Sequence, residues 1–162
     1  MERPRITLEK SPFDLAIETA TFFGVLILIS LPLIHYTSLP DIIPTHFNSK
    51  GMADGYGSKG TLLLLPIIGT VMCIGLYALT RFPHIFNYPV EITAENAEKH
   101  YRNGTGLIRW LNLIIVTSLC FIEWRVIAVA TQGQGNLGPY FMPVFLGAIF
   151  GTIGIYLWKS RS

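Results

Sequence analysis

The fold of this chain is decided by the stretch Thr19–Pro40, TATFFGVLILISLPLIHYTSLP, which contains no Asp, Glu, Lys or Arg. A hydrocarbon core about 30 Å thick needs roughly 20 apolar residues in a helix, so this stretch is long enough to cross a bilayer. Lipid offers no hydrogen bonds to the backbone, and a spanning segment must therefore be a helix or part of a closed barrel. The apolar residues form a continuous run and do not alternate with polar ones, which favours a helix.

Three further stretches have the same character. Gly60–Thr80 carries no charge, Leu107–Ala130 is interrupted by three charged residues, and Tyr140–Trp158 ends just before Lys159. We therefore predict an all-α membrane protein, in which four transmembrane helices form one bundle and a single domain over residues 1–162. The predicted spans are about 14–36, 61–81, 107–130 and 139–158, and a structured extracytoplasmic loop follows the first of them.

The composition excludes the other broad classes of protein. Of the 162 residues, 51% are hydrophobic and only 14% are charged, with a net charge of +2. A soluble domain usually carries about 25% charged residues, so this chain has too little polar surface for water, and it is too apolar to be disordered. Two cysteines cannot form a disulfide framework, and the small positive excess gives no reason to expect nucleic acid as a partner. The partner that the composition predicts is the lipid bilayer.

The basic residues predict the orientation of the chain. Nine of the twelve Lys and Arg residues lie at the two chain ends or in and beside the second loop, two lie in the first loop, and Arg125 lies inside the third span. Because cytoplasmic loops carry the excess of Lys and Arg, we expect both termini in the cytoplasm.

The first loop, residues 38–59, then faces the outside and reads SLPDIIPTHFNSKGMADGYGSK. The alternation in Ile43–Phe47 suits a short strand, whereas Asn48–Gly51 and Asp54–Gly57 are typical of two successive turns. We expect this loop to be a folded cap over the helix ends.

The second loop, residues 82–106, faces the cytoplasm in this orientation. Thr93 can cap a short helix that runs through Arg102, and Gly104 and Gly106 can supply a stop and a hinge before the third span.

The first loop also carries a resemblance. Residues 39–59 resemble the pattern LPxxIPxHFNxxGxxDGYGSK of a bacterial membrane family of unknown function, which is related to the N-terminal module of SdpI-type proteins. Those proteins confer immunity to a secreted toxin and signal across the membrane. The segment FNYPVEITAENAEKHY, residues 86–101, is similar to the cytoplasmic segment of small members of that family. The resemblance implies a multi-pass protein of the bacterial cytoplasmic (inner) membrane, with a secreted peptide or another membrane protein as its partner.

Polar residues are expected to gather at the outer mouth of the bundle. With a rise of 1.5 Å per residue, Glu123 and Arg125 lie about 24 and 27 Å along the third span, near the side of the first loop. These groups either bind an external peptide, lipid headgroup or cation, or anchor the loop to the helices. We expect His46 and Asp54 to fold the loop back over the ends of the first three spans, close to Glu123 or Arg125. A donor from the loop or a neighbouring helix should meet Glu123. The candidates are His35, Asp41, His46, Asn48, Asp54, Glu123 and Arg125.

Two further groups are predicted within the bundle. Asp14 and Glu18 lie on successive helical turns, and Arg109 begins the third span at a similar depth, so an ion pair between them is favoured over a proton pathway. Gly147 and Gly151 form a GxxxG pattern, which either packs against another helix, within the chain or in a homo-oligomer, or reflects the abundance of glycine in membrane helices.

The motifs of common enzymes are missing from the sequence. We find no HExxH, GxSxG, P-loop or GxGxxG pattern, and no pair of catalytic carboxylates. The spacing of Asp41, His46 and Asp54 matches no established zinc pattern, so we predict neither a metal nor a cofactor. We expect a non-catalytic protein of the sensor or immunity type. A small transporter or channel acting as an oligomer, and a structural subunit of a membrane complex, remain as alternatives.

Overall fold

The structure, a computed structural model, describes residues 3–133 and 135–161. Its elements are α1 (Pro12–His35), η1 (Tyr36–Ser38), β1 (Ile42–Phe47), β2 (Ala53–Ser58), η2 (Lys59–Leu63), α2 (Leu64–Leu79), η3 (Pro83–Ile85), α3 (Ala97–Gln132) and α4 (Phe141–Ser160). Among the described residues, four helical stretches are long and apolar enough to cross a membrane. The predicted class, an all-α membrane protein with four such helices, is therefore confirmed.

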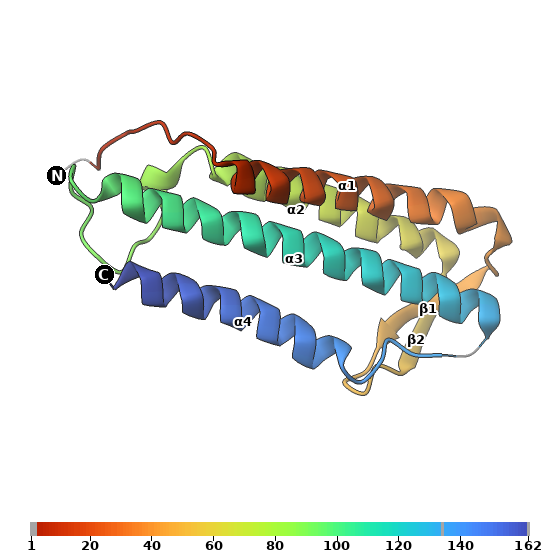
Figure 1. The fold of residues 1–162 in the computed structure, drawn as a ribbon. Helices are drawn as coiled ribbons and strands as arrows, with labels where there is room; N and C mark the ends of the chain where they lie inside the picture. The colour runs from red at the N-terminus through yellow and green to blue at the C-terminus, as the bar shows by residue number, and fades with distance from the viewer. Residues whose placement is uncertain (1–2, 134, 162) are drawn as a thin grey trace.

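The four long helices lie side by side, and both chain ends lie at the same end of the bundle (Figure 1). We name this the terminal end, and we name the opposite end, which carries β1 and β2, the hairpin end. Helix α3 is central, because it packs against α1, α2 and α4. Helix α3 therefore contacts each of the other three long helices.

Helix α1 begins at a complete capping box. Ser11 Oγ accepts a hydrogen bond from the backbone N–H of Asp14, and the Asp14 carboxylate accepts one from the backbone N–H of Ser11. Pro12 occupies the first helical position, where a missing N–H costs nothing because that N–H has no partner within the helix. These contacts fix where α1 starts and so fix the height of the acidic side chains that follow.

Glycines bring α1, α2 and α3 close together. A Cβ at Gly24 would lie 2.7 Å from Val116 Cγ1, and one at Gly69 would lie 2.6 Å from Leu28 Cδ2. Neighbouring side chains thus occupy the space that a side chain at either position would need. Such small-residue contacts supply packing in lipid, where the hydrophobic effect between helices is absent.

The expected break before the third span is wrong. The structure has one continuous helix from Ala97 to Gln132 instead of a short helix that ends near Gly104 and a separate span from residue 107. A Cβ at Gly104 would lie 3.0 Å from Tyr88 Oη, so this glycine lets an aromatic ring pack on the helix. The glycine is a packing site within α3, and the sequence pattern could not distinguish this from a helix stop.

The first loop is a two-stranded hairpin. Strands β1 and β2 pair antiparallel with Ile43 opposite Gly57, so the expected turn at Asp54–Gly57 is wrong and lies inside β2. A Cβ at Gly55 would lie 2.9 Å from His46 Cβ. Glycine suits this strand because side chains of β1 fill the space beside it. The turn at Asn48–Gly51 does form, with Gly51 at a φ of 74°.

The hairpin packs onto the bundle through an apolar cluster. Its members are Leu39, Ile43, Leu62, Val126 and Ile127, all of them buried. They come from the segment before β1, from β1 itself, from η2 and from the last third of α3. The loop therefore lies over the helix ends as a folded cap.

A second apolar cluster closes the terminal end, where Tyr88, Ile92, Ala97 and Tyr101 pack together. Tyr101 Oη donates to the backbone oxygen of Pro4 at 2.9 Å, which holds the N-terminal segment against the start of α3. Segment 82–96 is therefore ordered on the bundle and is tied to α3.

Helix α4 is the most exposed of the four. Its N-terminal end stacks on α3 through the rings of Phe121 and Phe141, whose centroids lie 5.3 Å apart. A Cβ at Gly147 or Gly151 would have no described atom within 4 Å, so these glycines do not pack against a described helix of this chain. The packing role within the chain that the GxxxG pattern suggested is therefore wrong, because α4 turns this face away from α3.

Candidate functional site

Arg109 links α3 to α1 inside the bundle. Its Nε atom donates to Glu18 Oε1 at 2.8 Å, and its NH1 atom donates to Asp14 Oδ1 at 3.1 Å. A third bond, also from NH1, reaches Thr105 Oγ1 at 3.2 Å. The side chains of Arg109, Asp14 and Glu18 are 7%, 14% and 14% exposed, so Arg109 compensates one of two negative charges where water is scarce.

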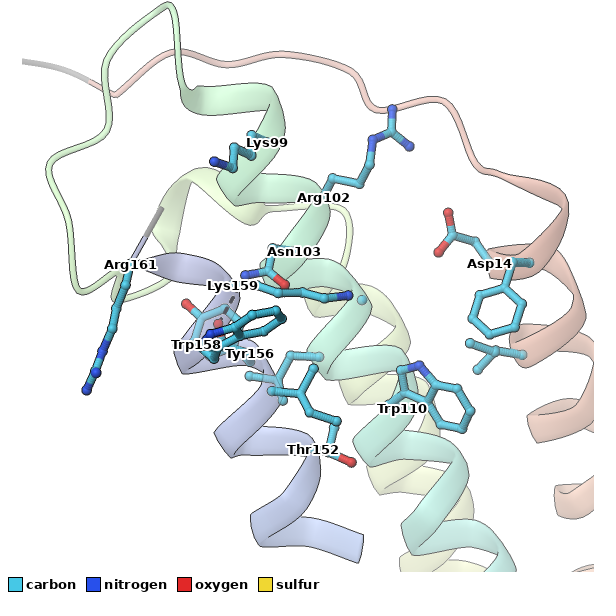
Figure 2. Close-up of a pocket in the computed structure, with 15 residues that line it drawn as sticks. Asp14, Lys99, Arg102, Asn103, Trp110, Thr152, Tyr156, Trp158, Lys159 and Arg161 are labelled. Atoms are coloured by element: carbon cyan, nitrogen blue, oxygen red, sulfur yellow. Dashed lines mark hydrogen bonds between the residues drawn. The ribbon is translucent and has the colours of Figure 1, made fainter.

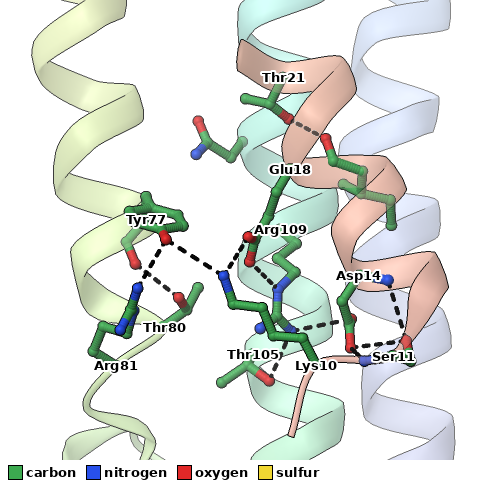
Figure 3. A network of polar contacts seen from close by, with 12 residues as sticks. Lys10, Ser11, Asp14, Glu18, Thr21, Tyr77, Thr80, Arg81, Thr105 and Arg109 are labelled. Carbon is green, nitrogen blue, oxygen red and sulfur yellow. Dashed lines mark hydrogen bonds and ion pairs between the residues drawn. The ribbon is translucent and has the colours of Figure 1, made fainter.

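The contacts continue from Glu18 to α2 (Figure 3). We name the connected side chains the polar network; they are Lys10, Asp14, Glu18, Tyr77, Arg81, Thr105 and Arg109. Lys10 Nζ lies 2.5 Å from Glu18 Oε2 and 3.4 Å from Tyr77 Oη. The hydrogen bond to Glu18 raises the pKa of Lys10 above its ordinary value, so this amine stays charged. Arg81 donates to the same Tyr77 oxygen at 2.9 Å. The polar network therefore joins the N-terminal segment, α1, α2 and α3.

A lateral pocket of 500 Å³ lies beside the polar network on the side of the hairpin end, between α1 and α2 and against α3. Its walls are largely apolar, and its polar lining includes Glu18, Tyr77, Arg109 and Asn112. The apolar lining residues are Leu15, Ile17, Phe22, Val25, Ile74 and Ile108. Because Phe22 and Ile74 are themselves exposed on the outside of the bundle, the pocket is bounded by side chains that face the surrounding medium.

Two polar atoms of the lateral pocket have no hydrogen-bond partner among the described residues. They are Thr70 Oγ1 and Asn112 Oδ1, and both are buried. The other half of the Asn112 amide is satisfied, because Nδ2 donates to the backbone oxygen of Cys73 at 3.1 Å. This bond fixes the orientation of the amide and leaves Oδ1 as an acceptor. Buried polar atoms are normally paired, so these two are unsatisfied polar groups in the wall of the pocket.

The polar residues of the hairpin contact one another. His46 Nδ1 lies 2.5 Å from Asp54 Oδ1, with side-chain exposures of 70% and 45%. Lys59 Nζ lies 3.1 Å from Asp41 Oδ1. Asn48 Oδ1 accepts two backbone hydrogen bonds of the turn, from Lys50 and Met52. His46 and Asp54 thus pair with each other across the hairpin, on its exposed surface. The expectation that they contact Glu123 or Arg125 is therefore wrong.

Arg125 holds the connection between α3 and α4. Its Nε atom donates to the backbone oxygen of Asn136 at 2.7 Å, and NH2 makes a second short contact with the same oxygen. The adjacent Leu137 N–H donates to the backbone oxygen of Gly51 at 2.7 Å, which joins this connection to the hairpin. His35 lies half-buried at the end of α1, and its carbonyl accepts from Ser38 Oγ at 2.8 Å. The contacts of Arg125 are those of an anchor, whereas His35 takes part here through its backbone only.

Glu123 is fully buried, with 0% of its surface exposed, and neither carboxylate oxygen has a hydrogen-bond partner among the described residues. The expectation that a donor meets this group is therefore wrong. By helical spacing Glu123 lies one turn beyond Leu119, which approaches Gly69, and one turn before the apolar cluster at Ile127. The hairpin covers this part of α3 with apolar side chains, so its polar groups do not approach the carboxylate.

Sequence reasoning found the carboxylates of the polar network but missed the lateral pocket. Thr70 and Asn112 are polar residues inside otherwise apolar spans, and that feature was the available signal. Across the described residues, no three His, Cys, Asp or Glu side chains gather closely enough to hold a metal ion.

Comparison with known proteins adds a family for part of the chain. Residues 23–70 match the domain of unknown function DUF1648. The DUF1648 region covers the second half of α1, the whole hairpin and the first part of α2. An uncharacterized protein of Archaeoglobus fulgidus is 24% identical over 129 residues, a match that covers 71% of this chain and 70% of that relative. No solved structure matches the chain. These findings support a membrane-type family of unknown function.

Proposed function

We propose that this protein is a non-catalytic membrane sensor that binds an amphipathic ligand in the lateral pocket. The observation that carries the proposal is the pair of buried polar atoms, Thr70 Oγ1 and Asn112 Oδ1, which have no described partner in a pocket with apolar walls. Ligand pockets commonly combine apolar walls with a few polar groups that fix orientation. A ligand with an apolar body and one hydrogen-bond donor fits this lining.

The position of the lateral pocket indicates how the ligand arrives. The pocket lies between two helices that are apolar enough to span a membrane, so an apolar molecule can enter sideways from the lipid. An apolar secreted peptide has the required chemistry. The resemblance to SdpI-type proteins supports a sensor or immunity role in the bacterial inner membrane. The distribution of the basic residues supports cytoplasmic termini.

Helix α3 supplies the route from binding to signal. Asn112 and Arg109 both lie on α3, so a ligand in the lateral pocket contacts the helix that also packs on the hairpin and on segment 82–96. A ligand that shifts α3 moves both ends of the molecule. Segment 82–96 is then the surface to which a cytoplasmic partner binds.

A second candidate is the docking of another membrane protein on the outer hairpin. It is favoured by Ile42, Met52 and Tyr56, which are 61%, 54% and 63% exposed. Exposed apolar residues on an ordered hairpin suit a protein partner or the membrane interface. Co-purification from native membranes separates this function, and that of a structural subunit, from ligand binding.

Transport by a single chain has less support. The end of the bundle beyond the lateral pocket is filled by the cluster of Leu39, Ile43, Leu62, Val126 and Ile127. A path for a polar solute would have to lie between chains of an oligomer.

Cys73 provides a direct test, because its side chain lines the lateral pocket whereas Cys120 does not. In a Cys120→Ser background, an organic extract of spent culture medium should protect Cys73 from N-ethylmaleimide. The Asn112→Leu variant should lose this protection, because the acceptor is removed and the pocket is narrowed. Thr117→Val is the matched control, since Thr117 is an exposed α3 residue outside the pocket. Equal labelling with and without extract would contradict the proposal.

A cellular test addresses sensing itself. Deletion of the gene should change the sensitivity of the cells to their own secreted peptides, or change transcription in response to them. Complementation with Thr117→Val should restore the response, and complementation with Asn112→Leu should not. Unchanged sensitivity and transcription after deletion would remove the sensor function.

A further inference from the structure

A basic cleft lies on the other side of α1 from the lateral pocket. It has a volume of 1210 Å³ and lies between α1 and α4 at the terminal end, with α3 behind it (Figure 2). Its α3 face includes Gly106, Leu107 and Trp110. Helix α4 packs on α3 at one side only, so this face of α3 is left uncovered between α1 and α4.

The residues that line the basic cleft include four cationic ones: Lys99, Arg102, Lys159 and Arg161. Figure 2 shows Lys159 extending from α4 over the opening. The carboxylate that lines the cleft, Asp14, already forms an ion pair with Arg109 and accepts from Ser11. Arg102 pairs with Glu98 at 3.0 Å. Of the charged residues that line the cleft, four are basic and one, Asp14, is acidic.

Below the cations the lining becomes apolar and aromatic. Leu107, Ile155 and Phe13 contribute aliphatic and aromatic surface, and the ring of Phe13 lies 5.9 Å from that of Trp110. Trp158, at the end of α4, is 73% exposed. Tryptophan at such a level is typical of the boundary between headgroups and acyl chains. The cleft thus has a charged mouth at the membrane surface and an apolar floor at the depth of the hydrocarbon.

We propose that the basic cleft binds an anionic phospholipid, with its phosphate beside Lys159 and one acyl chain along the uncovered face of α3. Basic clefts between membrane helices on the side that carries the positive charge are suited to anionic headgroups. A zwitterionic lipid would bring its own cation into a positive mouth, and a soluble anion would leave the apolar floor exposed. The lipid would also fill the gap between α1 and α4 and so hold α4 on the bundle.

The glycines of α2 and α3 allow a matched test of the acyl-chain site. A Cβ at Gly106 has no described atom within 4 Å, so a side chain at this position starts in open space on the wall of the cleft and Leu should occupy part of it. Gly75 on α2 has the same open surroundings and lies outside the cleft. Gly106→Leu should reduce lipid occupancy, whereas Gly75→Leu should leave it unchanged, and neither variant alters charge.

The charge requirement is tested in the same way with Lys159→Gln and Lys50→Gln, the second of which removes one cation from the hairpin. The full-length protein is extracted from vesicles of equal phosphatidylglycerol and phosphatidylcholine, and retained lipid is counted by native mass spectrometry. The wild type should retain phosphatidylglycerol preferentially. Lys159→Gln should lower its retention about fivefold, as expected for the loss of one cation near a charged headgroup. Lys50→Gln should match the wild type.

Three results would overturn the proposal. Equal retention of the two lipids would show that charge does not select the ligand. Equal retention by Lys159→Gln and Lys50→Gln would remove the cleft mouth as the headgroup site. If Lys159→Gln lowers the retention of phosphatidylglycerol and Gly106→Leu does not, the cleft binds an anion but no acyl chain. Circular dichroism of each variant shows that it is folded, and Gly106→Leu provides a test that remains valid if Lys159→Gln fails to fold.

Discussion

The Nε atom of Arg109 donates a 2.8 Å hydrogen bond to Oε1 of Glu18, while Lys10 approaches the other oxygen of the same carboxylate at 2.5 Å. One carboxylate on α1 is thereby held between a cation of α3 and a cation of the N-terminal segment. Neither cation can be removed without leaving a buried charge less well neutralised. Three elements that are distant in sequence depend on this contact for their relative positions.

Arg109→Gln should therefore destabilise the bundle strongly. Removing one partner of a buried ion pair typically costs about 3–5 kcal/mol, because the remaining charge stays buried without compensation. The measurement is the unfolding midpoint of the purified protein in detergent. Arg102→Gln is the control, since its pair with Glu98 is exposed and such pairs contribute about 0.3–0.5 kcal/mol. Similar midpoints for the two variants would contradict the structural role of Arg109.

Glu123→Leu should make the protein more stable. The Glu123 carboxyl is fully buried without a described partner, and an unsatisfied buried polar group costs about 1–3 kcal/mol, which a leucine of similar size avoids. The change is measured as a higher unfolding midpoint in the same detergent. Val116→Ala, which removes methyl groups from the side chain that packs against Gly24, should lower the midpoint instead. A lower midpoint for Glu123→Leu would contradict the assignment of Glu123 as an unsatisfied buried group.

Gly69→Ala should destabilise the packing of α2. The added Cβ would lie 2.6 Å from Leu28 Cδ2 and 2.9 Å from Leu119 Cδ1, and overpacking of this kind costs about 1–3 kcal/mol. Gly75→Ala is matched to it, because it lies on the same helix and meets no described atom within 4 Å. Thermal unfolding of both variants decides the point, and equal effects would mean that α2 does not pack through Gly69.

The terminal end should lose stability at alkaline pH through Tyr88. Burial raises the pKa of Tyr88 above its ordinary value of 10.0, and its hydroxyl donates to the Pro83 carbonyl at 3.0 Å. A raised pKa means that the folded state retains a proton that the unfolded state releases. Stability is then complete below pH 10 and falls as the pH rises further.

Unfolding midpoints measured across this alkaline range test the assignment to Tyr88. Tyr88→Phe should be less stable than the wild type at neutral pH, because the hydrogen bond is lost, but should show a weaker alkaline decline. Tyr56→Phe changes an exposed tyrosine of the hairpin and serves as the control. An identical decline in all three proteins would assign it to another group.

The hairpin should depend on its apolar cluster and not on its exposed ion pair. Ile43→Ala removes a side chain that is 1% exposed, and such truncations cost about 2–5 kcal/mol. Asp54→Asn breaks the exposed pair with His46 and should cost less than about 1 kcal/mol. Protease sensitivity of the hairpin in vesicles measures both variants. Greater sensitivity in Asp54→Asn than in Ile43→Ala would reverse this view of the cap.

The sequence was sufficient for features that depend on residues near in the chain or on composition. The helices followed from long uncharged runs, and the contact of Arg109 with Asp14 and Glu18 followed from helical spacing and depth. Strand β2 was missed because the run DGYG is typical of turns when read alone. Its glycines are explained only by the side chains of β1 that lie across from them.

The lateral pocket was missed for a different reason. Its lining comes from α1, α2 and α3, and it exists because those helices separate at one level while Gly24 and Gly69 bring them together at another. Periodicity within one helix contains no information about such separations. The same holds for Gly104, whose role depends on a tyrosine from another segment.

The continuity of α3 has a mechanical consequence. A helix from Ala97 to Gln132 is about 54 Å long, whereas the hydrocarbon core is about 30 Å thick, so α3 projects beyond it. A helix longer than the bilayer responds to bilayer thickness by changing its tilt. One of its ends carries the hairpin and the other carries segment 82–96. A change of tilt therefore displaces these two surfaces in opposite directions, so bilayer thickness and the positions of the hairpin and of segment 82–96 are mechanically coupled.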